Sequence, residues 1–344
     1  MRHRPFLQLL AFVFVVAWGN ACFHCTAEAK DFVVDAKGGD GTYKTVQAAI
    51  NAVPAGTANE RTRILIKPGT YSEQLRVPDK KVFLSLIGTG AKPEDVVLTF
   101  NLTAKSTKPG GGVVGTSDSS STFINASDFT AENLTFSNSA PPKIAQAVAI
   151  KPQADKLAFY RCRFLGFQDT LYPCRARQYY KECYVTGTVD FIFGDATAVF
   201  DHCTINSSDK GYITAASTGQ NVPHGLIFLD CTLTATDNAA KQPNTVFLGR
   251  PWRPYAQAAY IRCKMGPHIR AVGWDNWNNA ANEKTARYVE FGSMDLTGKL
   301  LDVSQRVKWS KQLTADQAKE YTIENVLSGK DRWEPAAGFT TAKK

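Results

Sequence analysis

The chain has 344 residues, 44% hydrophobic and 21% charged, which is too hydrophobic for a disordered protein and long enough for one large domain or two ordinary ones. Its net charge of +9 and pI of about 9.1 favour a polyanionic partner such as nucleic acid, anionic lipid or an acidic polysaccharide. Good solubility alone explains such a charge equally well.

The N-terminus is typical of a secretory signal peptide. A basic start, Arg2-His3-Arg4, precedes an apolar run at residues 6–18 that is too short to span a bilayer comfortably. Ala27-Glu28-Ala29 offers a cleavage site, so we expect residues 1–29 to be removed and residues 30–344 to form one secreted, extracellular domain without a membrane segment. Two of the eight cysteines leave with the signal, and the rest suit an oxidising compartment. Four sequons predict a glycoprotein if the host is eukaryotic: Asn101, Asn125, Asn133 and Asn206.

Short helices are predicted near both ends of the mature chain. Residues 45–53 carry apolar side chains at helical spacing, and Thr314-Ala-Asp-Gln317 has the sequence of a capping box that opens a helix through about Leu327. Residues 101–122, with runs of Gly and Ser, are predicted to be a long loop. Nothing between these segments indicates a second domain.

Five cysteines in the middle of the chain share one local pattern. Each has an aromatic residue three positions before it and an apolar residue two positions after it. The copies are residues 159–164, 180–185, 200–205, 228–233 and 260–265, and Leu134 takes the cysteine position in an earlier copy. Repeats of this length, each with a short strand and no helical pattern, predict an all-β fold, a parallel β-solenoid. An antiparallel sandwich is the alternative, but it does not explain the repeated cysteine position.

Cysteines at equivalent positions of adjacent coils can be close enough for a disulfide, because neighbouring strands lie about 4.8 Å apart. Cys183 and Cys203 are the pair that we expect to be bonded. The alternative is a column of free, buried thiols that behave as small hydrophobic groups.

Asp169 and Asp190 each follow a cysteine of this column by seven positions. If Cys162 and Cys183 stack, the two aspartates occupy the same position on adjacent coils, about 5 Å apart. Two carboxylates this close do not both ionise easily, so the pair divides into a proton donor and an anionic nucleophile or base. The neighbouring residues add an amide donor and aromatic surface: Gln168, Tyr172, Phe191 and Phe193.

Five motifs, in order and spread over most of the mature chain, resemble those of the pectin methylesterases. They are Gly69-Thr-Tyr71-Ser-Glu73, Gln146-Ala-Val-Ala-Ile150, Gln168-Asp-Thr-Leu-Tyr172, Asp190-Phe-Ile-Phe-Gly194 and Leu248-Gly-Arg-Pro-Trp252. The resemblance implies a right-handed parallel β-helix that hydrolyses the methyl esters of homogalacturonan (pectin) to pectate and methanol, without a metal or cofactor. The polyanionic partner is then the pectin backbone rather than nucleic acid, and a monomer is the default expectation.

The same resemblance implies a role for each residue of the site. Asp190 would attack the ester carbonyl, Gln146 and Gln168 would hold the oxyanion, and Asp169 would protonate departing methanol and then activate water. Arg250 would keep Asp190 ionised through charge-assisted hydrogen bonds. Trp252 would stack on a galacturonate ring.

Further side chains are expected at the substrate, and each has a structural alternative. Tyr172 and Phe193 supply aromatic surface. Trp277, like Trp274, lines the groove or fills the core. Arg177 binds substrate carboxylates or belongs to a solvated basic loop. Glycine, tyrosine and glutamate of the first motif, at positions 69, 71 and 73, are interpreted as structural.

Two other functions stay open. Paired carboxylates on a β-helix also cleave glycosidic bonds, as in polygalacturonases, and a separation of about 5 Å suits a retaining mechanism. A pectin-binding protein without activity is the non-enzymatic alternative, although such a protein is expected to lack Asp169, Asp190, Gln168 or Arg250. No long inhibitor-like region precedes the catalytic part, in contrast to many plant pectinesterases, which indicates a bacterial or animal type.

Overall fold

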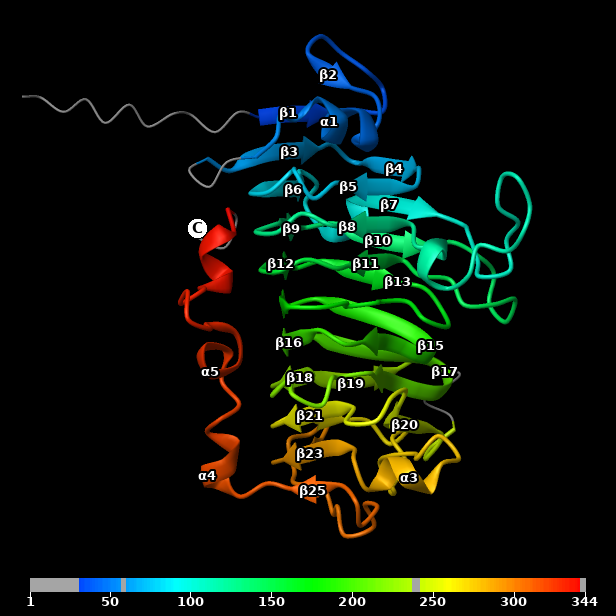
Figure 1. Ribbon diagram of the computed structural model, residues 1–344, viewed down its shortest axis with the longest axis vertical. Coiled ribbons are helices and arrows are strands. Elements are labelled where there is room, and N and C mark those ends of the chain that lie inside the picture. The colour runs from blue at the N-terminus through cyan, green and yellow to red at the C-terminus, as the bar shows by residue number, and fades with distance from the viewer. Residues whose placement is uncertain (1–30, 57–59, 237–241, 341–344) are drawn as a thin grey trace, which may run out of the picture.

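The strands of this protein stack into a solenoid. The computed structural model describes residues 31–56, 60–236 and 242–340, and their strands wind into a right-handed parallel β-helix whose coils follow one another along the long axis (Figure 1). The all-β solenoid predicted from the repeated cysteine position is therefore confirmed. The predicted signal peptide, residues 1–29, lies outside the described residues.

Three parallel sheets form the faces of the β-helix. The first sheet has twelve strands, in the order β2 (Thr42–Tyr43), β1 (Asp31–Val34), β3 (Thr62–Ile66), β6 (Leu84–Gly88), β9 (Thr130–Glu132), β12 (Leu157–Tyr160), β14 (Arg177–Lys181), β16 (Thr197–Asp201), β18 (Leu226–Leu229), β21 (Gln257–Ile261), β23 (Arg287–Phe291) and β25 (Lys311–Gln312). The second has ten, β24 (Met294–Asp295), β22 (Lys264–Met265), β19 (Thr232–Ala235), β17 (Thr204–Ala216), β15 (Tyr184–Gly194), β13 (Arg163–Leu165), β10 (Thr135–Asn138), β7 (Val96–Phe100) and β4 (Gly69–Ser72), with β20 (Val246–Pro251) paired to β17. The third consists of β11 (Ile150–Pro152), β8 (Thr122–Ile124) and β5 (Leu75–Val77).

The third face extends beyond its three strands and will carry the site. Isolated parallel bridges join Ile150 of β11 to Leu171, and Leu171 to Ile192 of β15. The pairing of β15 with β17 shifts register between Gly187 and Ile192, so the second halves of these long strands pair separately from the first halves, and β20 pairs with the second half of β17. The third face therefore continues from β5 to β20.

The repeated aromatic and cysteine positions form the core. The rings three positions before the cysteines stack from coil to coil, with centroids 4.5–4.9 Å apart, in the order Phe159, Tyr180, Phe200, Phe228 and Tyr260. The residue just before each cysteine has a left-handed backbone, with φ between 49° and 54°. This single residue per coil turns the chain from the first sheet into the second, and it leaves the cysteine facing inward.

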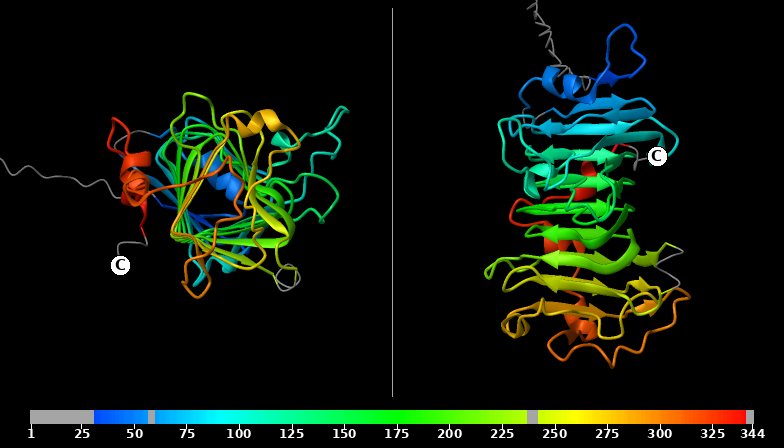
Figure 2. Two further views of the ribbon diagram at one scale, coloured as in Figure 1. Left: turned by 90° about the horizontal axis from the view of Figure 1, so that it is seen from below. Right: turned by 90° about the vertical axis from the view of Figure 1, so that its right-hand side faces the viewer.

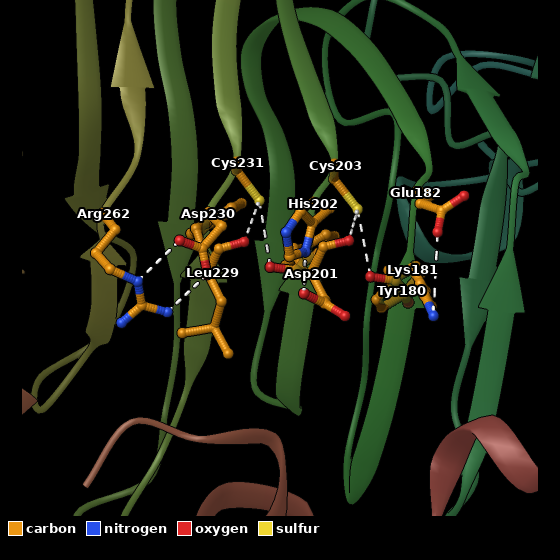
Figure 3. Close-up of polar contacts among 12 residues, drawn as sticks. Tyr180, Lys181, Glu182, Asp201, His202, Cys203, Leu229, Asp230, Cys231 and Arg262 are labelled. Carbon is orange, nitrogen blue, oxygen red and sulfur yellow. Dashed lines mark hydrogen bonds and ion pairs between the residues drawn. The ribbon is translucent and has the colours of Figure 1, made fainter. Parts of the chain in front are cut away.

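The predicted disulfide between Cys183 and Cys203 is wrong, because every cysteine in the described part of the chain is free and buried. Cys183 Sγ donates to Phe159 O at 3.5 Å and Cys203 Sγ donates to Tyr180 O at 3.3 Å, and Figure 3 shows this contact for Cys203 and its equivalent for Cys231. Side chains on in-register parallel strands point the same way, so their Cβ atoms stay about 4.8 Å apart, whereas a disulfide needs about 3.8 Å. The alternative of a thiol column is the correct one.

A short helix closes the N-terminal end of the core. Helix α1 (Val46–Ala52) confirms the helix predicted over residues 45–53 and lies across the interior when the molecule is viewed along its axis (Figure 2). Thr45 Oγ1 accepts a hydrogen bond from Ala48 N. The Glu73 carboxylate accepts from Val46 N and Gln47 N, which gives the first sequence motif the structural role expected of it.

The C-terminal segment runs back along the outside of the first sheet (Figures 1 and 2). The capping box between Thr314 and Gln317 is confirmed, but the single predicted helix is two, α4 (Ala315–Ala318) and α5 (Ile323–Leu327), because Thr322 is extended and caps α5. A 3-10 turn, η3 (Pro335–Gly338), follows. Val326, Leu327 and Phe339 pack on outward-facing apolar residues of the first sheet. No helix of the described residues is long and apolar enough to cross a bilayer.

Residues 101–121 form the loop that the sequence predicts, and it stands out from the second and third faces (Figure 1). It contains only an isolated bridge between Thr107 and Val113 and the 3-10 turn η2 (Ser117–Ser119). The backbone N–H of Ala104 donates to Gln146 O at 2.8 Å, which joins this loop to the segment before β11. Two other short helical turns are η1 (Pro93–Asp95) and α3 (Ala280–Glu283).

Candidate active site

Asp169 and Asp190 lie at equivalent positions of adjacent coils. The bridge between Leu171 and Ile192 aligns residues 21 positions apart, which places Asp169 beside Asp190, and Asp169 N donates to Val189 O at 3.1 Å. The predicted stacking of the two carboxylates is thus confirmed by the register. Both residues have positive φ, 64° and 51°, the left-handed conformation that the residues just before the cysteines also adopt.

Arg250 on β20 holds one of these carboxylates in a fixed orientation. Its Nε and Nη2 donate to the two carboxylate oxygens of Asp190 at 2.9 and 2.7 Å. The guanidinium group lies between two rings, 3.9 Å from the centroid of Tyr212 and 3.7 Å from that of Trp277. A planar cation stacked on both faces cannot rotate, so the bidentate pair is held in one plane.

The surroundings of the two carboxyl groups separate their protonation states. Both are nearly inaccessible, with exposed fractions of 8% for Asp169 and 6% for Asp190. Burial first, and then the charge of Asp190, raise the pKa of Asp169 well above its ordinary value, against the influence of Arg250. Burial also raises the pKa of Asp190, but the hydrogen bonds and charge of Arg250 oppose the rise. A proton shared by the pair therefore resides on Asp169, and Asp190 carries the negative charge.

The pair opens into a pocket of about 370 Å³ on the third face. The side-chain amides of Gln146 and Gln168 line it and make no hydrogen bond to any residue that the structure describes, so their N–H groups are available to a ligand. The full lining is Thr116, Ser117, Gln146, Gln168, Asp169, Tyr172, Asp190, Phe193, Ala215, Arg250, Trp252 and Trp277. Of the ten residues predicted for catalysis and substrate binding, nine therefore meet in one place.

Aromatic rings form one wall of the pocket. Tyr172 and Phe193 stack with centroids 4.1 Å apart, and Trp252 meets both edge-on, at 6.2 and 5.9 Å. Trp274, by contrast, is 1% exposed and stacks on a buried tyrosine, so the core alternative holds for it. Phe191 also points into the core.

Arg177 is the predicted site residue that lies elsewhere. Its Nη2 donates to Asp155 at 2.6 Å and to Asp331 at 2.9 Å, and its Nη1 donates to the carbonyl oxygens of Leu327 and Ser328. Asp155 lies in the turn between β11 and β12, and the other partners belong to the C-terminal segment. The expectation that Arg177 binds substrate carboxylates is wrong, because its donors are occupied in fastening that segment.

Several residues of the site escape prediction from the sequence. Tyr212, which supports Arg250, follows Cys203 by nine positions, whereas Val189, with which it pairs, follows Cys183 by six, because a register shift between β15 and β17 breaks the simple spacing. Thr116 and Ser117 come from the long loop, whose path carries no repeat signal. Within the described residues no three His, Cys, Asp or Glu side chains are grouped so that they could hold a metal ion.

Comparison with known proteins assigns the chain to a family. A family model described as Pectinesterase matches residues 31–330. The chain belongs to the pectinesterase family. Pectinesterase 31 of Arabidopsis thaliana is 42% identical over 285 residues, which cover 81% of this chain and 87% of that protein. A plant pectinesterase is thus matched over most of its length, so this comparison does not favour the bacterial or animal type expected from the sequence.

Solved structures agree. Pectin methylesterase from carrot has a TM-score of 0.82 at 29% identity, covering 92% of this chain and 98% of the carrot chain. A pectin methylesterase in complex with a hexasaccharide has a TM-score of 0.78 at 31% identity, covering 90% of this chain and 99% of its own. The relatives are carboxylic ester hydrolases, so the enzyme class inferred from the motifs, a pectin methylesterase, is confirmed.

Proposed function

We propose that this pectinesterase hydrolyses galacturonate methyl esters of homogalacturonan through an acyl intermediate on Asp190. The proposal rests on one observation, which is that the two carboxyl groups of the pair differ in their partners and therefore in their protonation states. Asp190 is ionised and oriented by two hydrogen bonds from Arg250, whereas Asp169 beside it is buried without a cation of its own. This is the arrangement that an anionic nucleophile and a neutral proton donor require.

In the first step an oxygen of Asp190 forms a bond to the ester carbonyl carbon, and the carbonyl oxygen becomes an oxyanion. The unoccupied amide N–H groups of Gln146 and Gln168 are the donors that would stabilise it. As the bond to the methoxy group breaks, Asp169 gives its proton to that group and methanol leaves. The products of this step are an acyl-Asp190 anhydride and an ionised Asp169.

In the second step the roles reverse. Asp169 takes a proton from water while the water oxygen attacks the acyl carbon, and the bond to Asp190 breaks. The galacturonate carboxyl group is released, Asp190 recovers its charge, and Asp169 is again protonated. Trp252, with the stacked rings of Tyr172 and Phe193, offers the apolar surface on which a sugar ring would lie.

The same proposal includes secretion after removal of residues 1–29, with residues 30–344 as one catalytic domain. Among the four sequons, Asn101 is exposed, which favours it as a glycan site. The amide of Asn133 donates to Gly88 O and Gly90 O, and Asn206 is buried. Net charge of +9 is consistent with an acidic polysaccharide as substrate.

The test is an assay of the mature protein on highly methylated homogalacturonan that follows methanol and new reducing ends in the same sample. Methanol without reducing ends is the expected result. Reducing ends without methanol would indicate a glycosidase or lyase, and neither product would indicate a pectin-binding protein.

A further inference from the structure

One of the two rings that enclose Arg250 comes from a loop rather than from a strand. Tyr212 lies on β17, which pairs with β20, so the sheet fixes this ring beside Arg250. Trp277 lies between the bridge at Trp274 and helix α3, where no strand pairing of the described residues reaches it. Its ring centroid is nevertheless 3.7 Å from the guanidinium carbon of Arg250. A contact other than sheet pairing must therefore hold Trp277 in place.

The carboxylate of Asp275 supplies that contact. Asp275 N donates a hydrogen bond to Gly249 O at 3.1 Å, which fixes this residue beside the chain neighbour of Arg250. Asp275 Oδ1 accepts a hydrogen bond from Trp277 N at 2.7 Å, as in an Asx turn. Trp277 has a φ of 61°, in the left-handed region that bulky side chains rarely adopt. The hydrogen bond stabilises this turn, and the turn directs the indole ring onto Arg250.

The rest of the loop is anchored independently of the indole ring. Asn276 Nδ2 donates to Glu283 Oε1 at 2.7 Å, and Asn282 Nδ2 donates to Asn276 O at 3.0 Å. Within the described residues, the bond to Asp275 is the only hydrogen bond that Trp277 makes. Loss of this bond should therefore release the indole ring without unfolding the loop.

The charge of Asp275 reaches the same site, although Asp275 forms no ion pair with any described residue. Burial is the main cause of the raised pKa of Asp190, the hydrogen bonds and charge of Arg250 oppose it, and the charge of Asp275 adds to it. Asp169 on the neighbouring coil and Tyr288 on β23 also have a pKa that the charge of Asp190 raises, after the effect of burial. An asparagine in place of Asp275 would keep the hydrogen-bond acceptor and remove the charge, so the two effects can be separated.

We propose that Asp275, by holding Trp277 on Arg250, is a positioning residue for the ester hydrolysis. The inference rests on the proposed function and adds to it a residue that does not line the pocket. With Trp277 displaced, only Tyr212 would support the guanidinium group, which would then be free to tilt and to carry the Asp190 carboxylate with it. A small displacement of a nucleophile slows the chemical step more than it weakens substrate binding.

The experiment compares the parent with Asp275→Ala and Asp275→Asn on highly methylated homogalacturonan. Asp275→Ala should lower kcat by about 10- to 100-fold with little change in KM, because the nucleophile is misplaced. Asp275→Asn should retain kcat within about twofold, because its side-chain oxygen still accepts from Trp277 N. The acid limb of its kcat/KM profile should lie at lower pH than that of the parent, since removal of the Asp275 charge lowers the pKa of Asp190.

Two other variants control for indirect effects. Asp302→Ala removes an equivalent turn away from the pocket, in which Asp302 Oδ1 accepts from Ser304 N at 2.9 Å, and it should leave kcat unchanged. Trp277→Ala should reproduce the loss of kcat. Adding Asp275→Ala to Trp277→Ala should lower kcat no further, because the two residues act in series.

The NMR signal of the Arg250 Nε proton reports on the same contact without turnover. Rings on both faces of the guanidinium group displace this signal through their ring currents, and Arg250→Lys identifies it by removing it. In Asp275→Ala the signal should move towards the position of an unstacked arginine, whereas in Asp275→Asn it should stay.

An unchanged kcat and an unchanged Arg250 signal in Asp275→Ala would overturn the inference. An equal loss of kcat in Asp275→Asn would also overturn it, because the charge and not the hydrogen bond would then act, and so would a loss confined to KM. If the parent releases no methanol but the Arg250 signal moves in Asp275→Ala, the proposed function fails and the hold of Asp275 on Arg250 stands. Normal methanol release by Asp275→Ala refutes the inference alone.

Discussion

Arg177 and Arg250 each hold a carboxylate through Nε and Nη2, but they lie in different surroundings. The donor–acceptor distances are 3.0 and 2.6 Å for Arg177 with Asp155, and 2.9 and 2.7 Å for Arg250 with Asp190. Arg177 also binds Asp331 and two backbone carbonyl groups of the C-terminal segment. Arg250 faces a pocket instead, between two aromatic rings.

The two regions differ in whether the arginine fully offsets the effect of burial on the pKa of the carboxyl group that it holds. At Arg177, burial would raise the pKa of Asp155, but the hydrogen bonds from Arg177 outweigh it and the pKa lies below the ordinary value. At Arg250, burial keeps the pKa of Asp190 raised and that of the adjacent Asp169 raised further. The ion pair of Arg177, which only fastens a segment, lowers the pKa of its carboxyl group. In the pocket both carboxyl groups keep a raised pKa, which is typical of catalytic sites.

The largest expected effect comes from replacing Asp190, the carboxylate that Arg250 holds. Asp190→Asn should lower methanol release by about 10⁴-fold or more and leave the melting temperature nearly unchanged, because the proposed nucleophile is lost from a rigid scaffold. Asp155→Asn is the matched control and should retain the activity of the folded protein. Near-normal turnover by Asp190→Asn would refute its assignment as nucleophile.

Asp169→Asn should lower kcat by about 10²- to 10⁴-fold, because the proton for departing methanol is lost. The pKa of Asp169 is raised, so its acid form persists well above the ordinary carboxyl range and activity in the parent should fall as pH rises through this pKa. That alkaline limb should be absent from the residual activity of Asp169→Asn. A pH–rate profile of the two proteins checks this, and an unchanged alkaline limb would assign it to another group.

The raised pKa of Asp169 also predicts how stability depends on pH. The unfolded chain ionises near the ordinary value of 3.8, whereas the folded protein ionises only at higher pH. The stability that Asp169 contributes is therefore complete below the unfolded pKa and is lost as pH rises towards the folded pKa. The unfolding free energy of Asp169→Asn, measured in denaturant, should therefore increase relative to that of the parent as pH rises over this range. A difference that does not change with pH would contradict the raised pKa.

The two arginines should respond in opposite ways to the same substitution. Arg250→Lys should lower kcat/KM by about 100-fold, because lysine cannot form the bidentate, doubly stacked contact. Arg177→Lys should leave kcat/KM unchanged and lower the melting temperature by a few degrees, since an ion pair exposed to this degree contributes about 1 kcal/mol. Assays and thermal melts of both variants would contradict the comparison if Arg177→Lys lost activity at temperatures where it is folded.

Much of this arrangement is readable from local spacing. The cysteine pattern repeats once per coil, so it predicts both the solenoid and the alignment of Asp169 with Asp190. The role of Arg177 is not readable in this way, because its partner Asp331 lies 154 positions away and meets it only after the C-terminal segment folds back. The role of Tyr212 also cannot be predicted from the spacing, because a local register shift precedes this residue in β17.

The smallest expected effect concerns the column of free thiols, which replaces the disulfide that the sequence wrongly predicted between Cys183 and Cys203. A bond between Cys183 and Cys203 would stabilise the protein by about 2–4 kcal/mol, whereas a column of thiols bonded to backbone carbonyls is indifferent to reductant. The melting temperature of the mature protein should therefore be the same with and without reductant, and thiol titration after denaturation should find six free groups. A lower melting temperature in reductant would mean that adjacent coils twist enough to bring two Cβ atoms together, which an in-register parallel pairing opposes.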